Sequence, residues 1–111
     1  MPDKQIADYL RDYCKGESRA VTSRELGAVF GVRGSELRGI VNRLRCGGIP
    51  ICSSEFGYFY AGNEQELSRT IRQLTSRIKK IAAARRGLIS AQTLYTDGGQ
   101  ISLPLEGGDS S

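Results

Sequence analysis

Apolar residues recur along the first part of the chain at the spacing of a short helix. Between Asp3 and Tyr13 the apolar side chains fall on one stripe, at Ile6, Tyr9, Leu10 and Tyr13. Because apolar residues three and four apart share one helix face, the stripe predicts a helix over these residues. Asp3 stands where a side chain can cap its first turn.

A second helix is predicted to begin after Thr22. Thr22 and Glu25 have the spacing of a capping box, in which each side chain accepts a hydrogen bond from the other residue's backbone N–H. Gly31 is expected to end this helix, and Val32 to fill the following turn against the core. Its apolar face comprises Leu26, Val29 and Phe30.

A third helix is predicted from Arg33 or Gly34 to about Cys46, where Gly47 and Gly48 end it. Its apolar positions follow the i, i+3, i+4, i+7 rule of a one-sided helix. We expect the buried stripe to be Leu37, Ile40, Val41 and Leu44.

A two-stranded hairpin is predicted next, with strands over residues 49–53 and 58–61 and a turn over residues 54–57. Residues 20–21 can add a short strand to it. Two helices joined by a tight turn and followed by a hairpin are typical of a winged helix-turn-helix, whose commonest use is to place one helix in a DNA major groove. The expected fold class is therefore mainly α with a small β hairpin, forming one winged domain over residues 1–62.

A long, basic, amphipathic helix is predicted over residues 63–88. Asn63 and Glu66 form a second capping box, the helix runs from about Glu64 to Arg86, and Gly87 ends it. Its apolar residues are spaced 4, 3, 4 and 3, which is typical of a narrow coiled-coil seam. Either a dimer or packing on the first helix would satisfy this seam, which consists of Leu67, Ile71, Leu74, Ile78 and Ile81.

The last segment, residues 89–111, changes in composition to Gly, Ser, Asp, Gln and Thr with scattered apolar residues. One interpretation is a mostly disordered, flexible tail. The other is a small hairpin of residues 90–95 and 100–105, joined through residues 96–99.

The charge of the chain is concentrated in two segments. The formal net charge is +4, but residues 19–53 alone carry six arginines against Glu25 and Glu36, and residues 69–88 carry seven cations and no acid. Basic segments framed by acidic ones favour a polyanion partner. Two solvated helix faces are the alternative.

Several function classes are disfavoured by the composition. The chain has no histidine, so it lacks the usual general base and a zinc set, and we expect no enzyme activity, no metal and no cofactor. Its three cysteines, Cys14, Cys46 and Cys52, suit reduced thiols in a cytoplasmic protein. No apolar run is long enough to span a membrane, and the first residues lack a signal-peptide pattern.

The outward face of the third helix is the candidate DNA-binding surface. Arg38 and Asn42 are expected to read bases, because a bidentate arginine suits guanine and an amide suits adenine. Ser35 is expected to contact a base or a phosphate. The cations assigned to this surface, mainly as phosphate contacts, are Arg33, Arg43 and Arg45. The hairpin turn carries Glu55 and no cation, so we expect the hairpin to contribute little.

The run SRELGAVFGVRGSELRGIVNRLR followed by GIPICSSEFGYFYA resembles the winged helix at the N-terminus of the biotin repressor and its small bacterial and phage relatives. The resemblance covers roughly residues 18–62 and implies a recognition helix followed by a wing. The chain departs from the family pattern at Arg33, where a small hydroxyl residue usually caps that helix. No ligase domain follows, so biotin chemistry is not implied.

The run QISLPL resembles the peptide by which bacterial replication and repair proteins bind the DNA sliding clamp. A short peptide of this kind binds through a few apolar anchors and a polar group that fixes its register. Leu103 and Leu105 would be the anchors, Gln100 the polar group, and Pro104 would restrict the unbound chain. The alternative is an edge strand whose alternating residues, Ile101, Leu103 and Leu105, face a core.

These observations together predict a DNA-binding adaptor that recruits or blocks the bacterial sliding clamp in replication. So compact a design suits a phage protein. The alternatives are a transcriptional regulator without a clamp partner and a pure protein-interaction module.

Overall fold

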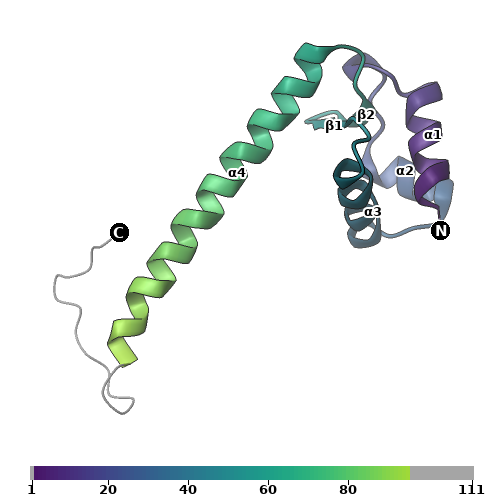
Figure 1. Cartoon of the computed structure of the whole chain (residues 1–111). Helices are drawn as coiled ribbons and strands as arrows, with labels where there is room; N and C mark the ends of the chain where they lie inside the picture. The colour runs from purple at the N-terminus through teal and green to yellow at the C-terminus, as the bar shows by residue number, and fades with distance from the viewer. Residues whose placement is uncertain (1, 96–111) are drawn as a thin grey trace. The chain divides into compact units, whose positions relative to one another are not determined.

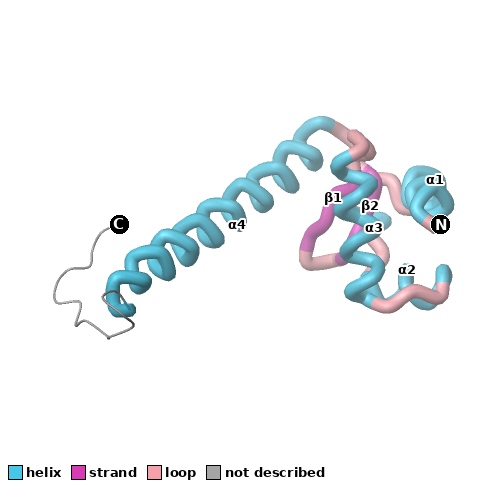
Figure 2. Tube along the Cα trace, turned by 60° about the horizontal axis from the view of Figure 1, so that its bottom comes forward, coloured by secondary structure: helices cyan, strands magenta, loops and turns pink. Residues whose placement is uncertain are grey.

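The computed structural model describes residues 2–95, and the chain divides into two compact units, residues 1–72 and 73–111. The helices and strands follow one another in the order shown in Figure 1, and Figure 2 colours them by type. They are α1 (Asp3–Tyr13), the 3-10 turn η1 (Glu17–Arg19), α2 (Ser23–Phe30), α3 (Gly34–Cys46), β1 (Ile51–Ser54), β2 (Gly57–Tyr60), α4 (Glu64–Ala91) and the 3-10 turn η2 (Gln92–Tyr95).

The chain is mainly helical with one small antiparallel hairpin, as the sequence predicts. β1 pairs with β2 from Ile51 opposite Tyr60 to Ser54 opposite Gly57. Two single bridges extend this sheet, one between Val21 and Tyr58 and one between Lys15 and Tyr60. The short strand expected at residues 20–21 is therefore reduced to one bridge, at Val21.

A single apolar core holds the first unit together. It is built from α1, α2, α3 and β1, and partly buried side chains such as Val32, Leu44 and Tyr58 pack against it. Removing these side chains from water is the main term that stabilises the unit. The core residues are Ile6, Leu10, Cys14, Leu26, Leu37, Ile40, Val41 and Ile51.

Two expectations for α1 are wrong. Asp3 does not cap the helix: the N-cap is Pro2, without a side-chain hydrogen bond, while the Asp3 carboxylate pairs with Arg43 of α3. Tyr13 is 67% exposed, and the buried face turns instead towards Ala7 and Cys14. The buried face of α1 is therefore rotated slightly about the helix axis from the predicted face.

The predicted start and end of α2 are confirmed. Thr22 and Glu25 form the capping box with both of its hydrogen bonds, and Gly31 adopts the left-handed conformation that ends the helix, with a φ of 66°. Val29, expected in the apolar face, is 55% exposed, whereas Gly27 is buried. A Cβ on Gly27 would lie 2.6 Å from the Val32 carbonyl oxygen, so the turn between α2 and α3 packs directly on this glycine.

The hairpin turn is fixed by Gly57. Its φ of 126° lies in a region that residues with a side chain rarely adopt, and a Cβ there would collide with the Val21 carbonyl. Tyr58, which follows Gly57, exchanges two backbone hydrogen bonds with Val21: its carbonyl accepts from the Val21 N–H, and its N–H donates to the Val21 carbonyl. The hairpin is therefore held against the segment that leads into α2.

α4 is longer than predicted. It continues through Gly87 to Ala91, so the expected end at Gly87 is wrong, as is the alternative strand over residues 90–95, which are helical. A glycine inside a helix costs only about 1 kcal/mol, which the residues on either side of it can offset. The expected tail therefore does not begin at residue 89, and residues 96–111 lie outside the described part of the chain.

Candidate nucleic-acid interface

One face of α3 is buried and the opposite face is polar and exposed. Leu37, Ile40 and Val41 are at most 2% exposed, as their spacing predicts. The exposed face carries Ser35, Arg38 and Asn42. Gly39 lies between the last two, and a Cβ there would make an ordinary contact with Arg43.

The N-terminus of α3 has no side-chain cap. Arg33 is the N-cap residue, and its side chain makes no capping hydrogen bond. The first N–H groups of α3 therefore have no side-chain acceptor, and the partial positive charge of the helix dipole at this end is not offset. Arg24 of α2 lies at the same place, because Arg24 and Arg33 both line a depression of about 400 Å³ beside the turn. From the sequence, Arg24 is only one of the six arginines of the basic segment 19–53, since its approach to Arg33 depends on how α2 meets α3.

Arg43 is engaged with α1. Its Nε lies 2.8 Å from Oδ2 of Asp3, and its Nη2 donates to Oδ1 at 3.2 Å. This pairing lowers the pKa of Asp3 and raises that of Arg43. The predicted phosphate contact at Arg43 would therefore compete with an existing ion pair.

Arg45 turns back into the protein, although its place on the helix wheel predicts an outward side chain. Its Nε donates to the carbonyl of Ile51 at 2.8 Å and its Nη2 to Oγ of Ser53 at 3.2 Å. The side chain thereby ties the end of α3 to β1. Of the six residues predicted to bind DNA, Arg33, Ser35, Arg38 and Asn42 remain exposed without such a structural bond.

No protein-family model, curated protein or solved structure matches this chain. We therefore infer its function from its residues and their geometry.

The hairpin offers little positive charge. Residues 51–60 contain no lysine or arginine, and the turn presents Glu55 and Phe56. Phe56 is 56% exposed and its N–H donates to Oγ of Ser54, which holds the turn in shape.

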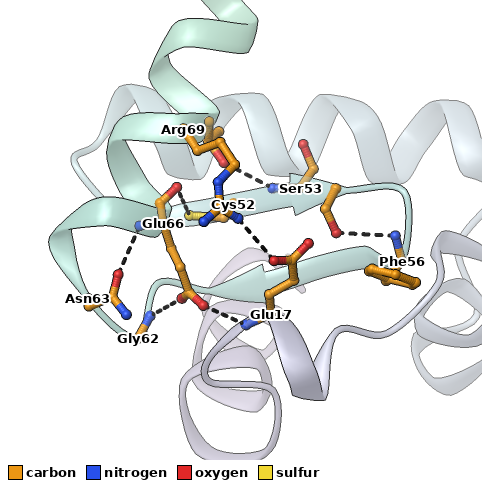
Figure 3. Close-up of polar contacts among 10 residues, drawn as sticks. Glu17, Cys52, Ser53, Phe56, Gly62, Asn63, Glu66 and Arg69 are labelled. Carbon is orange, nitrogen blue, oxygen red and sulfur yellow. Dashed lines mark hydrogen bonds and ion pairs between the residues drawn. The ribbon is translucent and has the colours of Figure 1, made fainter.

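A polar cluster anchors the first turns of α4 within the first unit (Figure 3). Oδ1 of Asn63 accepts from the Glu66 N–H at 2.9 Å, which is one half of the predicted capping box. The other half is absent, because the Glu66 carboxylate accepts instead from the N–H groups of Gly62 and Glu17, at 2.8 and 3.0 Å. These two donors lower the pKa of Glu66.

The same cluster reaches β1 and η1. Oγ1 of Thr70, the buried residue of α4, accepts from the Ser53 N–H, and Arg69 pairs with Glu17 at 3.0 Å (Figure 3). Sequence spacing could not find these contacts, because they join residues 17 to 52 positions apart.

The seam residues of α4 differ in exposure. Leu67 and Leu74 are half-buried, whereas Ile71, Ile78 and Ile81 are 53, 66 and 61% exposed. None of the described helices is long and apolar enough to cross a membrane.

The three thiols have unequal surroundings. Cys14 and Cys52 are buried, and burial raises the pKa of both, whereas Cys46 at the end of α3 is exposed. Among residues 2–95, no group of three or more side chains of the metal-binding kinds lies together.

The predicted clamp-binding residues are not part of this interface. Residues 100–105, which include Gln100, Ile101, Leu103, Pro104 and Leu105, lie outside the described residues.

Proposed function

We propose that this chain is a winged-helix DNA-binding protein that lays α3 in the major groove, with the β1–β2 hairpin as its wing. We further propose that residues 100–105 bind the bacterial sliding clamp, which places the protein in DNA replication or its modulation. The observation that carries the DNA proposal is the face of α3. Its exposed side chains suit base edges, and its uncapped end lies beside two arginines.

Arg38 and Asn42 are the proposed base readers. They are four residues apart on one exposed helix face, so both side chains can reach the edges of neighbouring base pairs. Arg38 would donate two hydrogen bonds to a guanine, and Asn42 would pair with an adenine. Gly39 between them adds no bulk, so the helix can approach the groove closely.

Arg24, Arg33 and the first N–H groups of α3 are the proposed phosphate contacts. A helix N-terminus favours an anion through its unpaired N–H groups and its dipole. The two arginines that line the adjacent depression add formal positive charge at the same place. A DNA phosphate seated there would supply the cap that Arg33 does not.

The clamp proposal rests on the residue types of the segment 100–105. Two leucines, a proline between them and a glutamine three residues before the first leucine form a short apolar peptide with one polar anchor. If this segment has no partner, the alternative function is a small winged-helix transcriptional regulator.

The DNA proposal is tested by fluorescence anisotropy with duplexes selected from a random library. We expect the double variant Arg38→Ala, Asn42→Ala to lose sequence preference. Arg24→Ala and Arg33→Ala should each weaken binding to all duplexes alike and lower the salt slope by about one.

Lys4→Ala is the matched control for these variants. It removes one exposed cation on α1, which pairs with Asp8 and is not among the proposed DNA contacts, and it should leave binding unchanged. Unchanged sequence preference in the double variant would overturn the assignment of α3. No binding of the wild type to any duplex would overturn DNA binding altogether, and binding that does not depend on salt would overturn the phosphate contacts.

The clamp proposal is tested by calorimetric titration of the full chain into a bacterial sliding clamp. Burial of two leucines less the cost of ordering predicts about micromolar affinity. The double variant Leu103→Ala, Leu105→Ala should lose this binding, and Ser110→Ala, Ser111→Ala should keep it. Equal clamp binding by both variants would show that Leu103 and Leu105 are not the anchors. No clamp binding by the wild type would favour the alternative function, a transcriptional regulator.

A further inference from the structure

The part of α4 in the second unit carries an apolar stripe that remains exposed. Ile78, Ile81 and Leu88 are 66, 61 and 72% exposed, and Leu74 precedes them on the same side of the helix. Single exposed apolar residues are ordinary on a protein surface, but three exposed residues and one half-buried residue on one narrow line mark an interaction surface.

Most charges of this segment lie off the stripe. At 3.6 residues per turn, Lys79 and Lys80 lie on the far side of the helix from Ile78 and Ile81. Residues 73–91 contain five cations and no acid. One face of the segment is therefore apolar and the opposite face is strongly basic.

We propose that this stripe pairs with the α4 stripe of a second copy of the chain, as a two-stranded coiled coil. The spacing from Leu74 to Ile78 to Ile81 is 4 and then 3, the repeat that keeps a seam in register with an identical partner. A branched isoleucine at one core position and leucine at the other favours two strands over three or four. Ile78 occupies the first of these positions, and the second is occupied by the leucines Leu74 and Leu88 with one isoleucine, Ile81, between them.

The positions beside the stripe allow two such basic helices to approach. Ala82 and Ala84 flank it and are small and uncharged, and Arg77 is the one cation at a flanking position within residues 73–91. The cations on the far side would remain in water after pairing, so like charges meet little across the seam. A lone basic helix on a lipid surface would bury a broader apolar face than this stripe offers.

Arg85 is the exception, since it falls on the stripe itself, between Ile81 and Leu88. A polar residue at one core position of a coiled coil fixes the register and limits the stability of the pair. We therefore expect a weak, concentration-dependent dimer that is tightened when Arg85 is replaced by an apolar residue. This inference is independent of DNA binding by α3.

The test is sedimentation equilibrium of the full chain over a range of protein concentrations. We expect a monomer–dimer equilibrium whose dissociation constant rises more than about tenfold in Ile78→Lys, because a charge enters the seam. Ser76→Lys is the matched control: it adds the same charge at an exposed position on the far side and should leave the equilibrium unchanged.

A second pair of variants tests the seam in the opposite direction. Arg85→Leu should tighten the dimer, whereas Arg86→Leu, which removes the same charge off the stripe, should not. Because these side chains are exposed, the variants should fold, which far-UV circular dichroism checks. A wild type that stays monomeric at every concentration would overturn the proposal, as would a dimer that Ile78→Lys and Ser76→Lys weaken equally. A protein that stays monomeric and binds vesicles of anionic lipid would assign the stripe to a membrane surface instead.

Discussion

α3 and the second-unit part of α4 have the same kind of sequence and opposite surroundings. Each carries apolar residues three and four apart and several cations on the other side. In α3 the apolar residues Leu37 and Ile40 are at most 1% exposed, whereas in α4 Ile78 and Ile81 are 66 and 61% exposed. The pattern thus identifies the face that is to be covered, but not what covers it.

This difference separates two uses of an amphipathic helix. The apolar face of α3 is covered by α1, α2 and β1, so its polar face is the one left for a partner. In the second-unit part of α4, the basic face and Ile78, Ile81 and Leu88 of the apolar stripe are all exposed, so each face can meet a partner of its own. The proposed partners follow from this: DNA for the polar face of α3, and a second copy for the apolar face of α4.

The largest expected effect is the loss of a core side chain from α3. Leu37→Ala should lower the free energy of unfolding by about 2–5 kcal/mol, since it removes fully buried methyl groups and leaves a cavity. Urea denaturation followed by circular dichroism measures it. Ile78→Ala, measured well below the dimer dissociation constant, should change it by less than about 0.5 kcal/mol, and equal losses would break the comparison.

Arg45→Ala comes next and separates structural from DNA-binding arginines. Truncation leaves the Ile51 carbonyl without its donor, which should cost about 1–3 kcal/mol of unfolding free energy. Arg38→Ala, on the exposed face of the same helix, is the control and should cost little. If Arg45→Ala left stability unchanged and abolished DNA binding, Arg45 would belong to the interface after all.

Acid sensitivity at Glu66 is a smaller effect. Because the hydrogen bonds of Glu66 lower its pKa in the folded state, they stabilise the fold above the ordinary pKa of a glutamate. This stability is lost as the pH falls through the lowered value. Glu66→Gln should therefore be less stable than the wild type at pH 7, by about 1 kcal/mol.

The test is the pH dependence of the difference in unfolding free energy between the wild type and Glu66→Gln. The gap between wild type and Glu66→Gln should close as the pH falls below about 4. Asp3, whose pKa is also lowered, stays in both proteins and leaves both with some acid sensitivity. A gap that is constant from pH 7 to pH 3 would mean that the charge of Glu66 does not matter.

The smallest effect is expected at the surface pair of Lys4 and Asp8. Lys4→Ala should change the unfolding free energy by less than about 0.5 kcal/mol, because Lys4 is 85% exposed and water screens the pair. The same urea experiment measures it. A larger loss would mean that α1 depends on its surface charges as well as on the core.

Local rules predicted the first unit well. The capping box at Thr22, the helix end at Gly31 and the burial of Leu37, Ile40 and Val41 each depend on residues within a few positions, and each is confirmed. Leu44, the fourth residue of the predicted stripe, is half-buried. The order of helices and hairpin follows from these local signals.

Features that depend on distant residues could not be predicted. Arg45 folds back because the carbonyl of Ile51 comes within its reach. The Glu66 carboxylate accepts from the N–H groups of Glu17 and Gly62 instead of completing the capping box. Spacing predicts buried positions for Tyr13 and Val29, whereas both are exposed. The end of α4 was misplaced because a glycine marks a helix end only where the following residues do not continue it.

The exposure of Cys46 makes the protein easy to label at one site. The other thiols, Cys14 and Cys52, are buried and have raised pKa values, so they form little of the thiolate that reacts with maleimides. A maleimide dye added briefly to the folded chain should therefore attach at the end of α3. Its emission would report any duplex or protein that settles against that helix, without a single substitution in the chain.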